Sequence, residues 1–329
     1  MMADDQFDKE TRELFPADLD KGVLTSVVRK ARRHSTIKTV LISAATSVLV
    51  VFGYFLLNAE LLNFWTNSLY SYSSLANQIS EPNVSLGDYH NSGGLFGGQF
   101  QLQTYKMIDG VPIPWTTQSY TYNIFSGYSR MTGNYSPSPQ ISTQSGMRPY
   151  NPQTEQREMM FYYPGINYRH YFHDLRQLKN IPRGDRVEMA LSFNKAYNYR
   201  QIPSMLPKGV HAAWYWVNAY SKQDIRSLAQ FPFPMMPNEV YGFGNMPAPV
   251  GHQRAQFIQA VETAMKTSGS LQYASRQIYD VLSHGKGRIV PADVKIIGIV
   301  VTGTPHALMA LQGKVFVKAS VLGAIANPY

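Results

Sequence analysis

The chain contains no cysteine among its 329 residues. This absence excludes disulfide bonds, zinc sites with thiolate ligands and a cysteine nucleophile. It leaves the compartment open, since an exterior protein without disulfides has the same composition. Apolar residues make up 44% of the chain, which is enough for a hydrophobic core, and the length allows two domains of ordinary size.

Catalytic motifs are also lacking. The sequence has no G-x-S-x-G elbow, no H-E-x-x-H pair and no GxxxxGK[ST] phosphate loop. The best alternative is YRHYFHD, in which His170 and His173 could share a metal with Asp174, but no zinc-protease glutamate accompanies them. Packed or interfacial histidines are the favoured interpretation. The sequence therefore predicts no enzyme activity, no cofactor and no metal site.

Long apolar runs are scarce, and only one reaches the length of a membrane span. Residues 39–57 form 19 positions without a charge. As a helix they would extend ~28 Å, close to the ~30 Å hydrocarbon core of a bilayer. A core helix of a soluble domain would show a polar face, and a cleaved signal peptide would have a shorter leader and apolar run. We predict an uncleaved transmembrane helix over residues 39–57.

Charges are distributed unevenly around this helix. The first 28 residues hold seven acids, whereas a basic collar of five cations immediately precedes or enters the apolar run. The collar comprises Arg29, Lys30, Arg32, Arg33 and Lys38. On the other side Glu60 comes first and no cation follows until Lys106. Because cations flank the cytoplasmic end of a span, we predict a cytoplasmic N-terminus and an extracytoplasmic C-terminus. Phe64, Trp65 and Tyr70 then lie where an interfacial aromatic belt is expected.

The predicted cytoplasmic segment, residues 1–38, is too short to fold alone but carries apolar residues at roughly helical spacing. The apolar positions are Phe7, Leu14, Phe15, Leu19, Val23, Leu24 and Val27, and the acids beside them include Asp8, Glu10 and Glu13. Pro16 interrupts the pattern or starts a second helix. Two interpretations remain open: an amphipathic element that binds a groove on a partner, or a solvated leader whose helix continues into the membrane.

The remainder is predicted to be an extracytoplasmic α+β region. Residues 58–156 are rich in Gly, Ser, Asn and Pro, which indicates short strands between tight turns and a linker over 133–156. Residues 157–329 show a period-two, half-buried strand at 187–193, a strand at 211–220, a helix after Ser221, helices within 254–269 and 270–285, a buried strand at 294–303 and a helix capped by Thr304. This pattern predicts a central sheet with helices.

Aromatic residues gather in the predicted outer domain. Trp214, Trp216, Tyr220, Tyr241 and Phe243 could line a ligand cleft, although aromatic residues on strands more often belong to the core. The portion after Leu57 carries a net charge of about +8, which could attract an anionic wall polymer or a lipid surface. The sequence thus leaves open a membrane-tethered envelope protein whose outer domain binds such a polymer or lipid.

The order of acidic tail, basic collar, single span and outer α+β domain resembles the membrane-anchored anti-sigma factors of Gram-positive-type bacteria, which carry sigma-factor-regulator N-terminal and C-terminal regions. The resemblance is clearest in LRQLKNIPRGDRVEMALSFNKAYNYRQIPSMLPKGVHAAWYWVNAYS, in YGFG and in DVKIIGIVVTGTPHALMALQGKVFVKASVLGAIANPY. A shorter match lies in FDKETRELFPADLDKGVLTSVVRKARRHSTIKTVLISAATSVLVV. The histidine–cysteine zinc motif of another anti-sigma class is missing.

This resemblance implies a partner for the tail, an extracytoplasmic-function sigma factor sequestered at the membrane. It implies no direct contact with nucleic acid. The outer domain would act as a sensor or as a platform for a second membrane regulatory protein, and release could follow conformational change or proteolysis.

Overall fold

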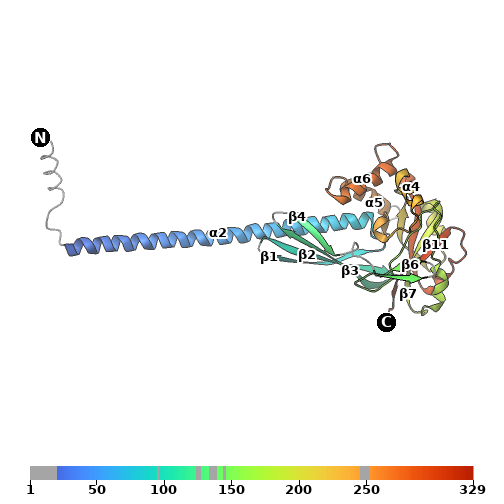
Figure 1. The fold of residues 1–329 in the computed structure, drawn as a ribbon, viewed down its shortest axis with the longest axis horizontal. Coiled ribbons are helices and arrows are strands. Elements are labelled where there is room, and N and C mark those ends of the chain that lie inside the picture. Colours follow the sequence, from blue (N-terminus) through green and yellow to red (C-terminus); the bar gives the residue numbers. More distant parts are fainter. Residues whose placement is uncertain are drawn as a thin grey trace. The chain divides into compact units, whose positions relative to one another are not determined.

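The structure is a computed structural model, and it describes residues 21–94, 96–123, 127–132, 139–143, 146–244 and 252–328. The chain divides into two compact units, Met1–Leu61 and Leu62–Tyr329. All described residues of the first unit belong to the helix α2. This helix runs without interruption from Lys21 to Ile79 and so extends into the second unit (Figure 1).

The predicted apolar span lies within α2, and its side chains have no protein to pack against. The most apolar window of this helix contains no buried residue, and large side chains such as Leu49, Phe52 and Leu57 are all exposed. Exposed apolar side chains around a whole helix are unfavourable in water and favourable in lipid. The predicted single membrane helix followed by an α+β domain is confirmed.

Helical structure continues past the predicted span, where the sequence indicated short strands. The reason is a second apolar stripe: Leu62, Trp65 and Leu69 recur at helical spacing and pack against the first sheet. Further along the helix, Tyr72 and Ile79 pack against the core of the central sheet. The end of α2 therefore belongs to the folded domain of the second unit.

A four-stranded antiparallel sheet follows, with the order β1-β2-β3-β4. Its strands are β1 (Ser85–Gly94), β2 (Gly97–Ile108), β3 (Val111–Asn123) and β4 (Gly127–Thr132). Phe100, Leu102 and Tyr120 face α2 and are buried. The edge strand β1 is largely exposed and shifts its register between Leu86 and Tyr89. A small hairpin, β5 (Gln140–Thr143) and β6 (Gly146–Pro149), lies in the segment predicted to be a linker.

The central sheet has five antiparallel strands in the order β11-β7-β10-β8-β9. These are β7 (Arg186–Asn198), β8 (Val210–Val217), β9 (Gly242–Gly244), β10 (Lys295–Gly303) and β11 (Val317–Ala326).

The longer helices of the second unit that follow α2 are α4 (Lys222–Gln230), α5 (His252–Ala264) and α6 (Ser270–Ser283), and α5 and α6 lie side by side (Figure 1). Short helical segments are η1 (Asp174–Asn180), η2 (Tyr199–Gln201), α3 (Ile202–Met205), η3 (Pro237–Glu239), η4 (Pro291–Asp293) and α7 (Pro305–Met309).

Both faces of the central sheet are buried, which corrects the prediction of a half-buried strand at 187–193. On one face Met189 and Leu191 of β7 pack with Phe257 of α5. On the other face residues 159–172 pack over the sheet, so Ala190 is buried too. Glu188 lies on this second face and is also fully buried.

The predicted helix starts are confirmed at two positions. Ser221 accepts a hydrogen bond from the Asp224 amide at 3.1 Å while Asp224 accepts one from the Ser221 amide at 2.8 Å, which forms a reciprocal cap for α4. The Thr304 hydroxyl accepts from the Ala307 amide at the start of α7.

Candidate functional site

The residues predicted to bind a sigma factor lie mostly before the described part of the chain. Phe7, Leu14, Phe15, Leu19, Asp8, Glu10 and Glu13 fall outside the described residues, as does Pro16. Val23 and Leu24 lie in the first turns of α2, where only the backbone is described. Val27 is the one predicted position with a described side chain, and it is 59% exposed. An exposed valine on the helix that bears the basic collar is available for contact with another molecule.

The five aromatic residues predicted to line a cleft do not lie together in one. Trp214 and Trp216 are buried on one face of β8, where Phe161 packs against both rings. Phe243 is buried on the opposite face, against Tyr215. Side chains alternate between the faces of a strand, so this separation follows from the pairing of Tyr215 with Phe243 in neighbouring strands.

Tyr220 lines a cavity. It lies just after β8, its hydroxyl accepts from the Trp216 indole at 2.9 Å and donates to the Glu239 carbonyl at 3.1 Å. Tyr241 packs against its ring at a centroid distance of 5.7 Å. Tyr220 is therefore held in a fixed orientation at the edge of the core.

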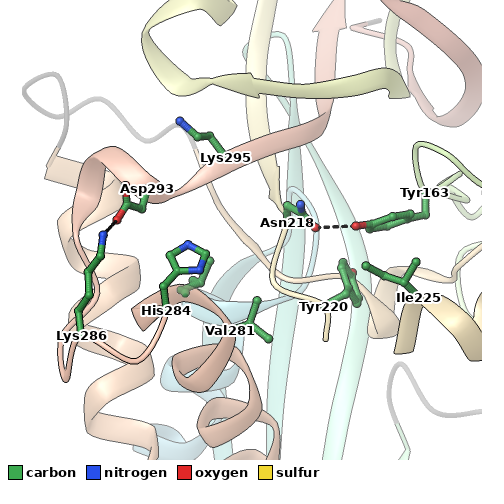
Figure 2. Close-up of a pocket in the computed structure, with 10 residues that line it drawn as sticks. Tyr163, Asn218, Tyr220, Ile225, Val281, His284, Lys286, Asp293 and Lys295 are labelled. Atoms are coloured by element: carbon green, nitrogen blue, oxygen red, sulfur yellow. Dashed lines mark hydrogen bonds and ion pairs between the residues drawn. The ribbon is translucent and has the colours of Figure 1, made fainter. Parts of the chain in front are cut away.

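The cavity beside Tyr220 is an open cleft of about 390 Å³, which Figure 2 shows. Its lining comes from Tyr163, from the end of β8, from α4, from the end of α6, and from the segment that leads into β10. The lining residues are Tyr163, Asn218, Tyr220, Ile225, Val281, Leu282, His284, Lys286, Asp293 and Lys295. Figure 2 shows Tyr163, Tyr220 and Ile225 across the cleft from Val281 and His284.

Cations dominate the polar rim of this cleft. The Lys286 ammonium lies 2.7 Å from an Asp293 carboxylate oxygen, and this hydrogen bond lowers the Asp293 pKa. The Lys295 ammonium hydrogen bonds the Asn198 side chain. His284 also lines the cleft, and its left-handed conformation, with φ of 50°, lets the chain turn sharply after α6. Three basic side chains against one acid favour a ligand that carries negative charge.

The aromatic wall is not suited to acid–base chemistry. The Tyr163 hydroxyl donates to Asn218 at 2.9 Å, and burial raises the Tyr163 pKa. Burial also raises the Tyr220 pKa well above its ordinary value. Both phenols therefore stay neutral over the physiological range. The cleft can bind a molecule with an apolar or planar part and an anionic group, and its tyrosines offer no base.

The histidine segment considered as a metal site has a different role. His170 and His173 are exposed, whereas Asp174 is buried and lies 2.8 Å from the Arg148 guanidinium. Asp174 also accepts from the Leu322 amide at 2.8 Å. This carboxylate ties η1 to β6 and β11, which is a structural use of the residue. In the described residues there is no cluster of three or more potential metal ligands from His, Cys, Asp and Glu.

Sequence reasoning missed most of the cleft lining. The segment SHGKGR, residues 283–288, lacks the GxxxxGK[ST] spacing of a phosphate loop, and its pattern predicts no other site. Its glycines at 285 and 287 have positive φ and form the turn that carries His284 and Lys286. Basic residues between turn-forming glycines were the available signal, but Tyr163, which lies across the cleft from this turn, is distant in the sequence.

Comparison with known families identifies two regions. Residues 25–113 match the family described as sigma factor regulator N-terminal, and residues 178–324 match the one described as sigma factor regulator C-terminal. No curated protein and no solved structure matches the chain at a significant level. The two matched regions together cover more than two thirds of the chain and include most of α2, the strands β1 and β2, and nearly all of the central sheet.

Proposed function

The chain belongs to the sigma factor regulator family, and we propose that it is an anti-sigma factor that holds an extracytoplasmic-function sigma factor at the membrane through its N-terminal tail. The observation that supports this most directly is the single apolar helix α2, preceded by an acidic segment and a basic collar. A protein anchored this way keeps any partner of its tail close to the lipid surface.

The charge distribution around α2 gives the proposed orientation. The collar places five cations at or near the N-terminal end of the apolar run, and none follows until Lys106. Under the positive-inside rule the tail then lies in the cytoplasm and the second unit lies outside. A topology reporter fused after Tyr329 tests this directly: activity of an exterior-specific reporter supports the orientation, and activity of a cytosol-specific reporter contradicts it.

In this proposal the tail contacts the sigma factor in two ways. The apolar stripe, with Leu14, Leu19 and Leu24 among its members, fills a groove on the partner. The acids Asp8, Glu10 and Glu13 meet basic surfaces that the sigma factor otherwise uses for DNA. Occupied in this way, the sigma factor cannot bind the RNA polymerase core. The tail positions precede the matched region, which begins at residue 25, so they depend on the spacing pattern alone.

The outer domain would control this sequestration. The cleft bounded by Tyr163, Tyr220 and Lys295 is where a small anionic ligand or a segment of a second membrane protein would bind. Its basic rim also suits an anionic lipid headgroup. Occupancy of the cleft would then change how the tail presents its apolar stripe.

Co-purification of the full chain in detergent with a sigma factor encoded beside it tests the central claim. We expect the wild-type chain to retain the sigma factor, and Leu14→Asp to lose it, because an aspartate in an apolar groove is unfavourable. The matched control is Leu57→Asp, outside the proposed tail, which should leave retention intact once the chain is in detergent. Equal retention by wild type and Leu14→Asp, or no retention by either, would contradict the proposal.

The same cleft supports a second function, that of a membrane-tethered envelope protein whose outer domain binds a wall polymer or lipid, with the tail acting only as an insertion signal. Deleting residues 2–28 distinguishes the two. Unchanged transcription with lost envelope function favours the tether, whereas constitutive activity of the sigma factor favours the anti-sigma factor.

A further inference from the structure

The turn that follows α2 buries a carboxyl group, one oxygen of which has no hydrogen-bond donor among the described residues. Glu81 lies two residues beyond Ile79, the last residue of α2, and only 8% of its surface is exposed. Its Oε2 atom has no hydrogen-bond partner among the described residues. Its backbone has φ of 65°, a left-handed conformation unfavourable for glutamate. Both features cost free energy, and strain of this kind concentrates at functional positions.

Two further carboxyl groups lie close to Glu81 in the same buried region. Glu188 of β7 pairs with Lys106 of β2 at 2.9 Å, and its oxygens also accept from Asn83 and from the Ala324 amide. Glu158 has one hydrogen bond, from the Asn151 side-chain amide at 3.0 Å. Glu188 is thus well compensated, whereas the other two acids are not.

Glu81, Glu158 and Lys106 line one small cavity together with Trp115. Its volume of about 30 Å³ is the space of a single water molecule. The charges that face Glu81 are Arg130 of β4, Lys106 of β2 and Glu158. Lys106 and Glu188 face Glu158. Lys106 is already engaged by Glu188 and by the face of the Trp115 ring, 3.9 Å from its centroid.

Positive charge in this region is therefore insufficient for three ionised carboxylates. Burying an unpaired carboxylate is so unfavourable that the group takes up a proton instead. In agreement with this geometry, burial raises the pKa of Glu81 to about 7, and burial also raises the pKa of Glu158.

We propose that the cavity at the end of α2 is a proton-binding site, in which Glu81 and Glu158 take up protons as the outside medium becomes acidic and thereby hold the α2–β1 turn against the domain. A metal ion is the other way to neutralise buried acids. The described residues contain no cluster of three potential ligands, and the Lys106 ammonium already lies at the centre of this group, so the proton is favoured.

Proton uptake would act at the point where α2 joins the domain. Asn77, in the last turn of α2, donates to the Val84 carbonyl at 2.8 Å, and Ser80 donates to the Val240 carbonyl at 3.0 Å. Asn83 bonds Glu188 at 2.7 Å. In our proposal these bonds order the turn while the Glu81 side chain stays buried. Protonation keeps it inserted, and ionisation favours its movement into water.

The link to regulation rests on the proposed function, because α2 is the helix that carries the tail. The proton-binding site itself does not depend on the proposed function. Its test therefore uses the full chain without a sigma factor, so that a failure here is distinguishable from a failure of sigma binding.

The experiment is hydrogen–deuterium exchange of the full chain in detergent at about pH 5.5 and about pH 8, corrected for intrinsic exchange. We expect protection of the backbone amides in 80–84 to fall about tenfold or more as the pH rises. Glu81→Gln, which is neutral at both values, should show a change of less than about twofold. Glu262→Gln is the matched control, since this glutamate is exposed on α5 and should leave the wild-type behaviour intact.

A second variant covers the case in which Glu81→Gln fails to fold. Burial is the main cause of the raised Glu81 pKa, and the charge of Glu158 adds to it, so Glu158→Gln should move the midpoint of the change in protection to lower pH. If Glu158→Gln acted only by disturbing the local structure, the pH midpoint of the change in protection would stay the same. Protection in 80–84 that is independent of pH in the wild type, or an unchanged pH response in Glu81→Gln, would overturn the proposal.

Discussion

Trp216 lies directly against Gly298, its partner across the β8–β10 pair, so closely that a Cβ atom on this glycine would be 2.7 Å from Cε3 of the indole. The same atom would lie 2.7 Å from the Leu191 carbonyl oxygen on the other neighbouring strand. The middle of the central sheet therefore has no room for a methyl group, and the large indole packs over the backbone of β10.

Replacement of this glycine should be strongly unfavourable. We expect Gly298→Ala to lower the free energy of unfolding by about 2–3 kcal/mol, because a backbone oxygen and a buried indole must both move. Urea unfolding of the full chain in detergent, followed by tryptophan fluorescence, measures the loss. Gly184→Ala is the control, since a Cβ there meets nothing within 4 Å, and a similar loss in both variants would contradict this packing.

The buried pair of Lys106 and Glu188 gives a second prediction. Lys106→Met should lower the free energy of unfolding by about 3–5 kcal/mol, because it leaves a buried carboxylate without its cation. Adding Glu188→Gln should recover part of this loss. The same denaturation experiment gives both values.

An exposed ion pair serves as the comparison for that prediction. Lys286 and Asp293 are 2.7 Å apart, compared with 2.9 Å for the buried pair, but the Lys286 side chain is 54% exposed. Lys286→Met should therefore change stability by less than about 1 kcal/mol. If the two lysine variants lost equal stability, burial would not be the cause.

The second unit should become less stable as the pH rises. The Glu81 pKa is about 7 in the folded protein and 4.5 as a free side chain, so the folded state binds the proton more tightly. The resulting stabilisation is complete below about pH 4.5 and is lost as the pH rises through about 7. The difference amounts to roughly 3 kcal/mol. Unfolding measured between pH 5 and 8 should show it in the wild type, and Glu81→Gln should lack this decline.

The membrane helix can be tested at its centre. Val50→Arg places a charge in the middle of the apolar run and should weaken insertion by about 2.5–3.5 kcal/mol, the cost of arginine at a helix centre. The measurement is the fraction of chain that stays with membranes after an alkaline wash. Ser35→Arg adds the same charge beside the collar and should have no effect; full retention of both variants would contradict a span at 39–57.

Some features of this fold can be predicted from the sequence because interactions between residues close together in the chain determine them. The uncharged run at 39–57 is found by length alone, and the caps at Ser221 and Thr304 are found because the bonded residues are three positions apart. The central sheet follows from periodicity and turn residues. The fold class was accessible for these reasons.

The buried acids were not accessible, because their environment is made by distant segments. Glu188 alternates with Val187 and Met189, so the pattern assigned it to a solvent face. Its cation, Lys106, belongs to a different sheet, and nothing local indicates that residues 159–172 cover the second face. The cleft escaped prediction for the same reason: Tyr163 and Lys295 are far apart in the chain.

The edge strand of the first sheet matters where many copies of the chain lie close together on one membrane. Strand β1 offers unpaired backbone groups along one side, to which a strand of a neighbouring molecule could attach. The register of β1 shifts between Leu86 and Tyr89, which bends this edge of the sheet. The exposed Asp88 between them adds a negative charge to the edge. Chains concentrated on one bilayer surface are thereby kept from joining edge to edge into a continuous, aggregating ribbon.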